Sequence, residues 1–351
     1  MEEIKLMQYS HGAGCGCKIA PSVLENILKS KVDSVSTKNL LVGNSTKDDA
    51  AVYDLCNGKA LISTVDFFMP IVDDAFDFGR IASANAISDV YAMGGKPILA
   101  TALLGWPINK LPVELAQRVL DGAKTICNQA GIPLAGGHSI DTVEPMFGLS
   151  VNGIVEIKNL KQNSTAKAGD LIYLTKPIGV GILAAAIKRG VLKEEHKAIF
   201  INQLTTLNSI GEQFGTLPYL HAMTDVTGFG LLGHLMEMCE GSGLSVELNY
   251  DAVPLIACLH EYLSKTTVPD NVNRNWKSFA EKVQGIGTES LSTLCDPQTN
   301  GGLLVSVDAA HQKEFELFLT TNHLKVFAKP IGKMLPKTTA VISIKTNLTA
   351  K

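Results

Sequence analysis

Two cysteines and a lysine stand among three glycines near the start of the sequence, in the segment HGAGCGCKI that runs from His11 to Ile19. An ammonium beside a thiol favours the thiolate, the form that attacks or binds a soft atom, and lysine also meets phosphate as a point charge. We therefore expect Lys18 to lower the pKa of a neighbouring thiol. The spacing alone leaves open whether Cys15 and Cys17 react, bind a soft metal or lie in a disordered tail.

A structural zinc site is not expected from these cysteines, because no second pair follows at the usual ligand spacing. The chain has seven cysteines, an odd number, and most of them stand in apolar surroundings. That pattern fits reduced thiols better than a disulfide framework, and it predicts buried positions for Cys127, Cys239 and Cys258.

A set of aspartates forms the second group of candidates, each placed where a strand or a helix of small residues meets polar residues: Asp48, Asp49, Asp66, Asp89 and Asp225. Hard cations such as Mg²⁺ prefer oxygen ligands, and one or two carboxylates plus substrate phosphates commonly complete their shell. Any one of these aspartates alone fits a loop carboxylate or a helix cap. Asp89 is harder to dismiss, since it falls within an otherwise small and apolar helix and needs a partner there.

Phosphate-binding motifs are weak in this sequence. It has no P-loop, and although residues 77–79 read DFG, the rest of the kinase motif set is missing. The glycine pair Gly136-Gly137, after a predicted strand and before His138, offers backbone N–H groups to phosphate oxygens, but an ordinary glycine turn is the better explanation.

The segment from Gly228 to Gly233, GFGLLG, is a formal dinucleotide-binding motif, and Glu247 follows near the distance of a ribose-binding acid. Two features argue against a nicotinamide site. The preceding YLHAMTDVT looks too polar for a buried first strand, and Asp225 would repel a pyrophosphate unless a cation intervened.

Hydrophobic periodicity predicts alternating strands and helices in both halves of the chain. In the first half we expect strands over 59–68 and 97–106 and helices over 78–93 and 112–131, with further strands after them. In the second half we expect helices over 179–189 and 228–239, and strands ending near 225 and covering 244–248 and 303–307. With 351 residues the chain is long enough for two α/β domains, and the polar stretch 158–170 puts their boundary near Asn163.

The charge balance gives no reason to expect nucleic acid or an anionic membrane as a partner, since 31 basic residues face 34 acidic ones for a net charge of −3. No stretch reaches the roughly 18 uncharged apolar residues of a membrane span, and no signal peptide is apparent. We expect a cytoplasmic protein.

Eight segments together resemble the selenophosphate synthetase family, also called selenide, water dikinase: QYSHGAGCGCKI, LLVGNSTKDDAAVYD, the stretch from STVDFF to MGGKPI, LGWPINKLP, AGGHSID, TKPIGVG, AMTDVTGFGLLGHL and CDPQTNGGLL. The resemblance runs in order from about Gln8 to beyond Gly332. It implies an α/β (α+β) fold like that of aminoimidazole ribonucleotide synthetase. The expected parts are a flexible glycine-rich catalytic segment and lead-in over 1–45, an N-terminal ATP- and metal-binding domain over 46–160, and a C-terminal α/β domain over 165–345. The sheets of two N-terminal domains would pair in a homodimer.

The activity that the resemblance implies is the synthesis of selenophosphate from selenide, ATP and water, with release of AMP and orthophosphate. The product supplies activated selenium for selenocysteine and selenouridine. Mg²⁺ and usually K⁺ would be the cofactors, and a selenium-delivery protein a further partner.

The family's functional residues fall on positions of this sequence that match its motifs. Cys15 and Lys18 would be catalytic, and the GFGLLG glycines would shape the turn that holds Asp225. The metal ligands would be Asp49, Asp89 and Asp225. The nucleotide contacts would be Lys18, Thr46, Lys47, Asp48, Asp66, Asp89, Gly137, His138 and Ser139, the last three from the same or the partner subunit.

Two other functions stay open from the residues. A purine-pathway ligase would share the fold and have no use for Cys15. A soft-metal or redox binding protein would use Cys15 and Cys17 without consuming ATP. The role of Cys17, the number of metals and the order of the phosphoryl steps are not fixed by the sequence.

Overall fold

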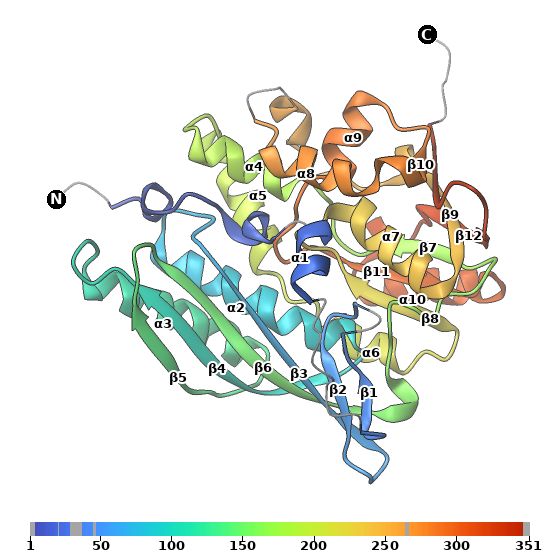
Figure 1. Ribbon diagram of the computed structural model, residues 1–351, viewed down its shortest axis with the longest axis horizontal. Coiled ribbons are helices and arrows are strands. Elements are labelled where there is room, and N and C mark those ends of the chain that lie inside the picture. The colour runs from blue at the N-terminus through green and yellow to red at the C-terminus, as the bar shows by residue number, and fades with distance from the viewer. Residues whose placement is uncertain (1–3, 20, 29–36, 45–46, 264–266, 347–351) are drawn as a thin grey trace.

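The computed structural model describes residues 4–19, 21–28, 37–44, 47–263 and 267–346, which form two β-sheets with helices packed against them (Figure 1). The first half of the chain contributes a six-stranded sheet in the order β1-β2-β3-β6-β4-β5. The second half contributes a seven-stranded sheet in the order β10-β13-β9-β12-β7-β11-β8. The mixed α/β class expected from periodicity is therefore confirmed.

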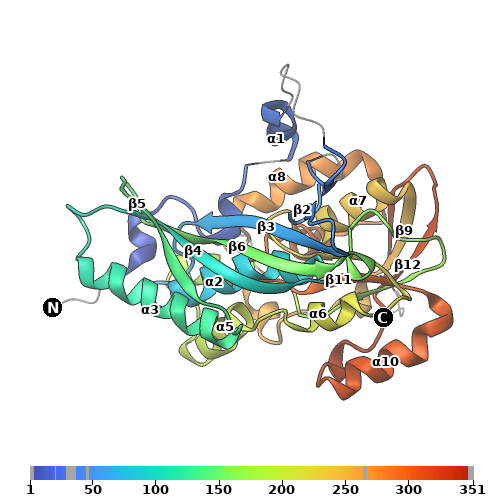
Figure 2. The same cartoon turned by 90° about the horizontal axis from the view of Figure 1, so that it is seen from below.

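Two helices, α2 and α3, lie on one face of the first sheet, and α1 lies on the opposite side (Figure 2). Its strands are β1 Leu40–Val42, β2 Ala51–Asp54, β3 Lys59–Phe68, β4 Lys96–Trp106, β5 Leu134–Asp141 and β6 Met146–Glu156. The helices of this half are α1 Pro21–Leu28, α2 Ala75–Ala92 and α3 Val113–Gln129.

The second sheet is built by the strands β7 Leu171–Leu174, β8 Leu220–Asp225, β9 Leu244–Asn249, β10 Val283–Gln284, β11 Leu303–Val307, β12 Gly332–Pro336 and β13 Ile342–Lys345. Its helices are α4 Val180–Lys188, α5 Glu194–Thr205, α6 Ile210–Gly215, α7 Gly230–Ser242, α8 Asp270–Phe279, α9 Thr288–Leu294 and α10 Gln312–Thr321. Short 3-10 helices are η1 Leu6–Tyr9, η2 Gly14–Cys17, η3 Ile157–Asn159, η4 Tyr250–Ala252, η5 Leu259–Tyr262, η6 Ala280–Lys282, η7 Ala309–His311 and η8 Lys325–Phe327.

The predicted elements agree with these bounds to within three residues, and two of the differences have a physical explanation. Helix α2 begins at Ala75 rather than Phe78, because the Asp74 side chain accepts a hydrogen bond from the Asp77 N–H and caps the helix earlier. The glycine turn expected before His138 is wrong, since β5 runs through the glycine pair and ends at Asp141. Pairing with β4 continues through the glycine pair, but the register shifts between Ala100 and Ala102, and Gly136 (φ +113°) and Gly137 (φ +154°) both have positive φ values.

Helix α2 is buried on nearly all sides, and its small residues explain how. At Gly79 an added Cβ would lie 1.9 Å from the Val119 carbonyl oxygen, and at Gly122 it would lie 2.0 Å from that of Phe76, so α2 and α3 pack with their backbones close together. The opposite side of α2 contacts α5, α6 and β8 from the second half. A helix in this position carries its polar residues into the space between the two sheets.

One hydrophobic cluster spans both halves of the chain, from Val52 and Ile81 to Leu183, Phe200 and Leu259. None of the helices described is both long enough and apolar enough to cross a lipid bilayer.

Candidate active site

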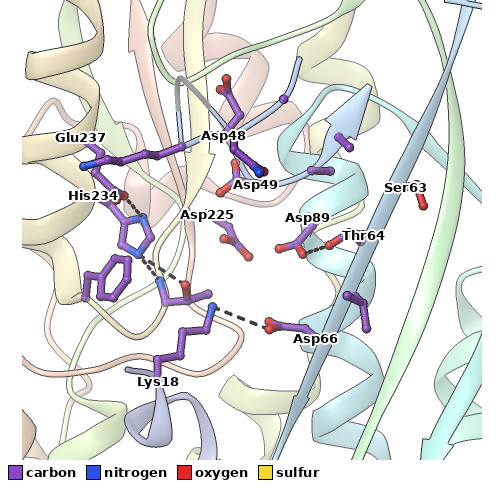
Figure 3. A pocket seen from close by; sticks show the side chains of 18 of the residues that line it. Lys18, Asp48, Asp49, Ser63, Thr64, Asp66, Asp89, Asp225, His234 and Glu237 are labelled. Carbon is purple, nitrogen blue, oxygen red and sulfur yellow. Dashed lines mark hydrogen bonds and ion pairs between the residues drawn. The ribbon is translucent and has the colours of Figure 1, made fainter. Parts of the chain in front are cut away.

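A cavity of about 610 Å³ lies where β3, α2, β8 and α7 meet (Figure 3). Its lining includes many charged side chains. Among the described residues that line it are two lysines and six carboxylates: Lys18, Lys47, Asp48, Asp49, Asp66, Asp89, Asp225 and Glu237. The cavity is formally very acidic, which is unusual for a site that would bind a negatively charged substrate without cations.

Four elements bring the central aspartates together. Asp66 stands on β3, Asp89 on α2 and Asp225 at the end of β8, while Asp49 shortly precedes β2. Three of the carboxylates accept one hydroxyl hydrogen bond each: Thr64 Oγ1 donates to Asp89 Oδ2 (2.5 Å), Ser88 Oγ to Asp225 Oδ2 (2.6 Å) and Thr224 Oγ1 to Asp49 Oδ1 (2.8 Å). These bonds fix one oxygen of each group and leave the other for a ligand.

Burial and mutual repulsion disfavour the ionised form of this cluster. Burial, followed by the neighbouring carboxylates, raises the pKa of Asp49 and of Asp89 well above the usual range. Burial also raises the pKa of Asp225 to about 6, although the Ser88 hydroxyl and Lys18 act in the opposite direction. Asp49 Oδ2 is buried and has no hydrogen-bond partner. A cation among these oxygens would offset the burial and the mutual repulsion of the carboxylates and would give Asp49 Oδ2 a partner.

The donor set suits a hard divalent cation better than a soft metal, because it consists of carboxylate oxygens. Within the described parts of the chain, no three His, Cys, Asp or Glu side chains are placed so that they could hold a metal ion by themselves. Magnesium sites commonly use one or two carboxylates and take the remaining ligands from water and phosphate. The arrangement therefore fits a metal that binds together with a phosphorylated ligand.

Lys18 follows η2 and points into the cavity, where its Nζ lies 3.7 Å from Asp66 Oδ1. About a third of its side chain is exposed (37%). Burial would lower the pKa of Lys18, but Asp66 and then Cys15, Asp89 and Asp225 outweigh it and raise the pKa above the ordinary value. The lysine thus provides a permanent positive charge beside the carboxylates.

Cys15 precedes Lys18 by three residues and is only 1% exposed. Its Sγ donates to Asn85 Oδ1 (3.3 Å), and Asn85 Nδ2 donates in turn to Asp66 Oδ2 (2.5 Å). Its backbone N–H donates to Thr299 Oγ1 (3.0 Å). The glycine-rich strip is therefore packed between the two halves of the chain.

Lys18 acts to lower the pKa of the Cys15 thiol, as predicted, but the thiolate expected from it is wrong. Burial raises the pKa of Cys15 far above its ordinary value, and the attraction of Lys18 offsets only part of that effect. The sequence showed the lysine but not the burial. Cys15 is consequently a neutral thiol that donates a hydrogen bond to Asn85.

The structure brings most of the predicted site residues to this one cavity: Lys18, Lys47, Asp48, Asp49, Asp66, Asp89 and Asp225. Thr46 lies outside the described residues. The segment 137–139 does not line the cavity of its own subunit. It stands exposed on β5, the edge strand of the first sheet, and β4 and β6 separate it from β3.

Asn85 and Thr299 are site residues that the sequence reasoning missed. Asn85 had a usable signal, because it precedes Asp89 by four residues and so lies on the same face of the helix. Thr299 had none, since it meets Cys15 across 284 positions of the sequence.

The GFGLLG glycines surround the turn that follows Asp225. An added Cβ at Gly228 would lie 2.8 Å from the Cys15 carbonyl oxygen, so glycine lets the strip approach, and Gly230 has a φ of +72°. The expectation that the preceding strand is too polar to be buried is wrong, since five of the six residues of β8 are buried. β8 pairs antiparallel with β11, whereas a dinucleotide motif begins at a parallel strand.

His234 on α7 holds the same turn from its other side. Its Nε2 accepts a hydrogen bond from the Thr227 N–H (3.0 Å), and its Nδ1 lies 3.5 Å from Glu237 Oε2. Burial, aided by Lys18, lowers the pKa of His234 to about 3, so the ring is neutral and carries its proton on Nδ1. His234 is thus a positioning residue for the loop after Asp225.

We expect His234→Ala to lower the free energy of unfolding by about 2 kcal/mol, because the buried Thr227 N–H loses its acceptor. His234→Gln keeps an acceptor and should lose less. The folded pKa lies below the ordinary 6.5, so the unfolded chain binds a proton that the folded chain does not, and stability falls as the pH drops from about 6.5 towards 3. Urea unfolding at several pH values in this range gives the free energy of unfolding as a function of pH. Its slope against pH should be shallower for His234→Gln than for the wild type. Parallel slopes would contradict the assignment.

Comparisons with known proteins agree over most of the chain. Residues 47–155 match the family model described as AIR synthase related protein, N-terminal domain, and residues 167–345 match AIR synthase related protein, C-terminal domain. A selenide, water dikinase of Aeromonas hydrophila subsp. hydrophila is 56% identical over 96% of this chain and 97% of its own length. One of Colwellia psychrerythraea is 53% identical over 98% of this chain and 99% of its own length.

Solved structures with the same fold are more distant in sequence. Thiamine-monophosphate kinase from Stenotrophomonas maltophilia has a TM-score of 0.64 and 19% identity, covering 88% of this chain and 92% of its own. The hydrogenase maturation protein HypE in complex with ATP has a TM-score of 0.64 and 15% identity, covering 95% of this chain and 88% of its own. With the family models they confirm the predicted two-domain fold of the aminoimidazole ribonucleotide synthetase type.

Proposed function

The chain belongs to the selenide, water dikinase family, and we propose that the acidic cavity binds ATP through divalent cations and transfers its γ-phosphoryl group to selenium. The activity is the ATP-dependent synthesis of selenophosphate from selenide and water, with release of AMP and orthophosphate. One observation carries the assignment of the site: a buried thiol and a protonated lysine adjoin a cluster of carboxylates that lacks neutralising charge.

Asp49, Asp89 and Asp225 would hold Mg²⁺. Their raised pKa values and the unpartnered Asp49 Oδ2 support this, because a bound cation would stabilise the ionised form of each carboxylate. When bound, the metal neutralises charge on the phosphoryl oxygens. A potassium ion is a further proposed cofactor, based on the resemblance to the family.

Lys18 presents the second positive charge to the triphosphate. A nucleotide carries about four negative charges, and an anionic nucleophile cannot approach the γ-phosphorus until they are balanced. The Asp66 carboxylate holds the lysine Nζ at 3.7 Å, within the cavity and ready to meet a phosphoryl oxygen. Thr46, Lys47, Asp48, Asp66 and Asp89 complete the proposed contacts with the nucleotide and its metals.

Cys15 positions the selenium substrate beside the phosphorus. Sulfur is soft and polarisable, so it suits contact with selenium better than an oxygen ligand would. The hydrogen bonds to Asn85 and Thr299 fix the thiol and its backbone and join it to Asp66. Burial also keeps water, the competing nucleophile, away from this step.

A homodimer is proposed from the free face of the first sheet. Helices α2 and α3 cover one face of this sheet (Figure 2). Its strands expose the large apolar side chains Val65, Phe67, Ile98 and Ile140, between 41% and 54% exposed. Such a face is typical of an interface. A second copy packed there would present its own 137–139 segment, with His138, to the nucleotide, which a single subunit does not do.

The proposed division of the chain has three parts: a glycine-rich catalytic segment over 1–45, an ATP- and metal-binding domain over 46–160 and a C-terminal domain over 165–345. A selenium-delivery protein is a further proposed partner.

The test is phosphorus NMR of the anaerobic protein with ATP, Mg²⁺ and selenide. We expect resonances of selenophosphate, AMP and orthophosphate to appear together and to require all three components. ADP as the only nucleotide product would contradict the proposed function. Omitting selenide is the matched control, because it separates selenium phosphorylation from simple ATP hydrolysis.

A further inference from the structure

A second cavity, of about 320 Å³, lies on the other side of the glycine-rich strip from the acidic one. Its walls are formed by the strip itself, by α4 and by the start of α8. Its charge is opposite to that of the first cavity. Among the described residues that line it, the three lysines and arginines outnumber the one carboxylate: Lys188, Arg189 and Arg274 against Asp270.

Cys15 stands between the two cavities. Gly12, Ala13 and Gly16 line the basic one, whereas Lys18 lines the acidic one. The Cys15 N–H donates to Thr299, which also lines the basic cavity, and the thiol donates to Asn85, which bonds to Asp66 in the acidic cavity. The strip thus forms a thin wall with the thiol inside it.

Some residues of the basic cavity fix the strip in place, and others carry positive charge that no carboxylate balances. Lys188 Nζ donates to the carbonyl oxygens of Ser10 (3.2 Å) and His11 (3.0 Å), and Asn271 Nδ2 donates to that of Gly16. Arg189 and Arg274 are exposed, and across the described residues no carboxylate forms an ion pair with either guanidinium. Arg274 donates a hydrogen bond to the neutral Asn271 Oδ1, so an anion that reached the cavity would meet two positive charges that no carboxylate balances.

The charge of the selenium substrate favours approach to Cys15 through the basic cavity over approach through the acidic one. Hydrogen selenide is an anion at neutral pH. The acidic cavity presents six carboxylates against two lysines, and a bound triphosphate would add negative charge and occupy the space. In-line phosphoryl transfer also needs the nucleophile on the side opposite the leaving group.

We propose that the basic cavity admits the anionic selenium substrate to Cys15 from the side of the strip opposite the nucleotide. The inference rests on the proposed function, because it concerns the second substrate of that reaction. Lys188 secures the wall, while Arg189 and Arg274 attract the anion and raise its local concentration. The two substrates then reach the reacting centre by separate paths.

The test is steady-state kinetics of the double variant Arg189→Gln/Arg274→Gln in the anaerobic selenophosphate assay. The KM for selenide should rise about ten-fold, and the difference should shrink as salt is added, because the lost effect is electrostatic. The KM for ATP and kcat at saturating selenide should not change. The matched control is Lys325→Gln/Lys329→Gln, which removes the same charge from exposed positions that line neither cavity and should leave the KM for selenide unchanged.

A second variant separates space from charge. Ala185→Phe keeps every charge but fills the basic cavity from α4, and it should raise the KM for selenide without changing that for ATP. Urea unfolding like that of the wild type verifies its fold. An unchanged KM for selenide in both variants, or an equal rise for ATP, would overturn the inference, as would a change confined to inhibition by orthophosphate, which would make the cavity a product exit. Failure of the wild type to form selenophosphate would instead overturn the proposed function.

Discussion

Replacing Cys15 by serine is expected to lower the rate of selenophosphate formation by at least about a hundred-fold, with little change in affinity for Mg²⁺-ATP. Serine fits the same space and can donate the same hydrogen bond to Asn85, so the local structure should be kept. What it lacks is a soft atom to position the selenium. Phosphorus NMR measures the first quantity, and nucleotide titration of the same preparation measures the second.

The control for Cys15→Ser is Cys56→Ser, which removes an exposed thiol outside both cavities and should retain full activity. Cys17→Ser is expected to be much milder than Cys15→Ser. Equal losses from Cys15→Ser and Cys17→Ser would show that the wrong thiol has been chosen. A loss of Mg²⁺-ATP affinity in Cys15→Ser would place the cysteine in the nucleotide site instead.

Replacing Asp49 or Asp225 by asparagine should weaken Mg²⁺-dependent ATP binding by at least about a hundred-fold and leave the ligand-free protein as stable as before or more stable. At about 100 times its Kd, a ligand stabilises a protein by about 2.7 kcal/mol, and each variant should lose most of that gain. Thermal unfolding with and without Mg²⁺-ATP measures both effects.

The environment of the carboxylates explains why these substitutions should weaken Mg²⁺-ATP binding and yet not lower the stability of the ligand-free protein. The pKa of Asp225 in the folded chain, about 6, exceeds its ordinary value of 3.8, so the folded chain keeps a proton that the unfolded chain has lost. The free energy of unfolding of the ligand-free protein therefore falls as the pH rises through this window. Asp225→Asn should remove the part of this decrease that Asp225 causes. The control is Asp121→Asn on the exposed face of α3, where Lys124 is 3.7 Å away. Unchanged Mg²⁺-ATP affinity in both variants would contradict the assignment of metal ligands.

Much of the site could be predicted because its residues break a local pattern. Asp89 interrupts a run of small apolar residues, and the structure places it in the acidic cavity. Asp66 interrupts an apolar strand and Asp225 ends a strand of mixed composition, and both positions mark residues that face a crevice. Each of these signals lies within a dozen residues of sequence, where periodicity is informative.

The rest depends on contacts between distant segments. Nothing near Cys15 in the sequence indicates that Asn85 and Thr299 close around it, so the lysine beside it suggested a thiolate where the fold makes a neutral thiol. The same holds for His138, whose place at the edge of the sheet is set by the strand order. The burial of β8 was missed because pairing with β11 and packing beneath α7 and α2 override a mixed composition.

The position of α2 has a consequence for how the chain unfolds. This helix packs against the first sheet with one side and against α5, α6 and β8 of the second half with the other, and a single hydrophobic cluster runs through it. Neither half can therefore lose its tertiary structure without exposing apolar surface of the other. Two-part enzymes commonly unfold in separate steps, but here the shared helix favours one cooperative calorimetric transition. Ligands of the acidic cavity should shift that transition as a whole, since the residues that line the cavity come from both halves.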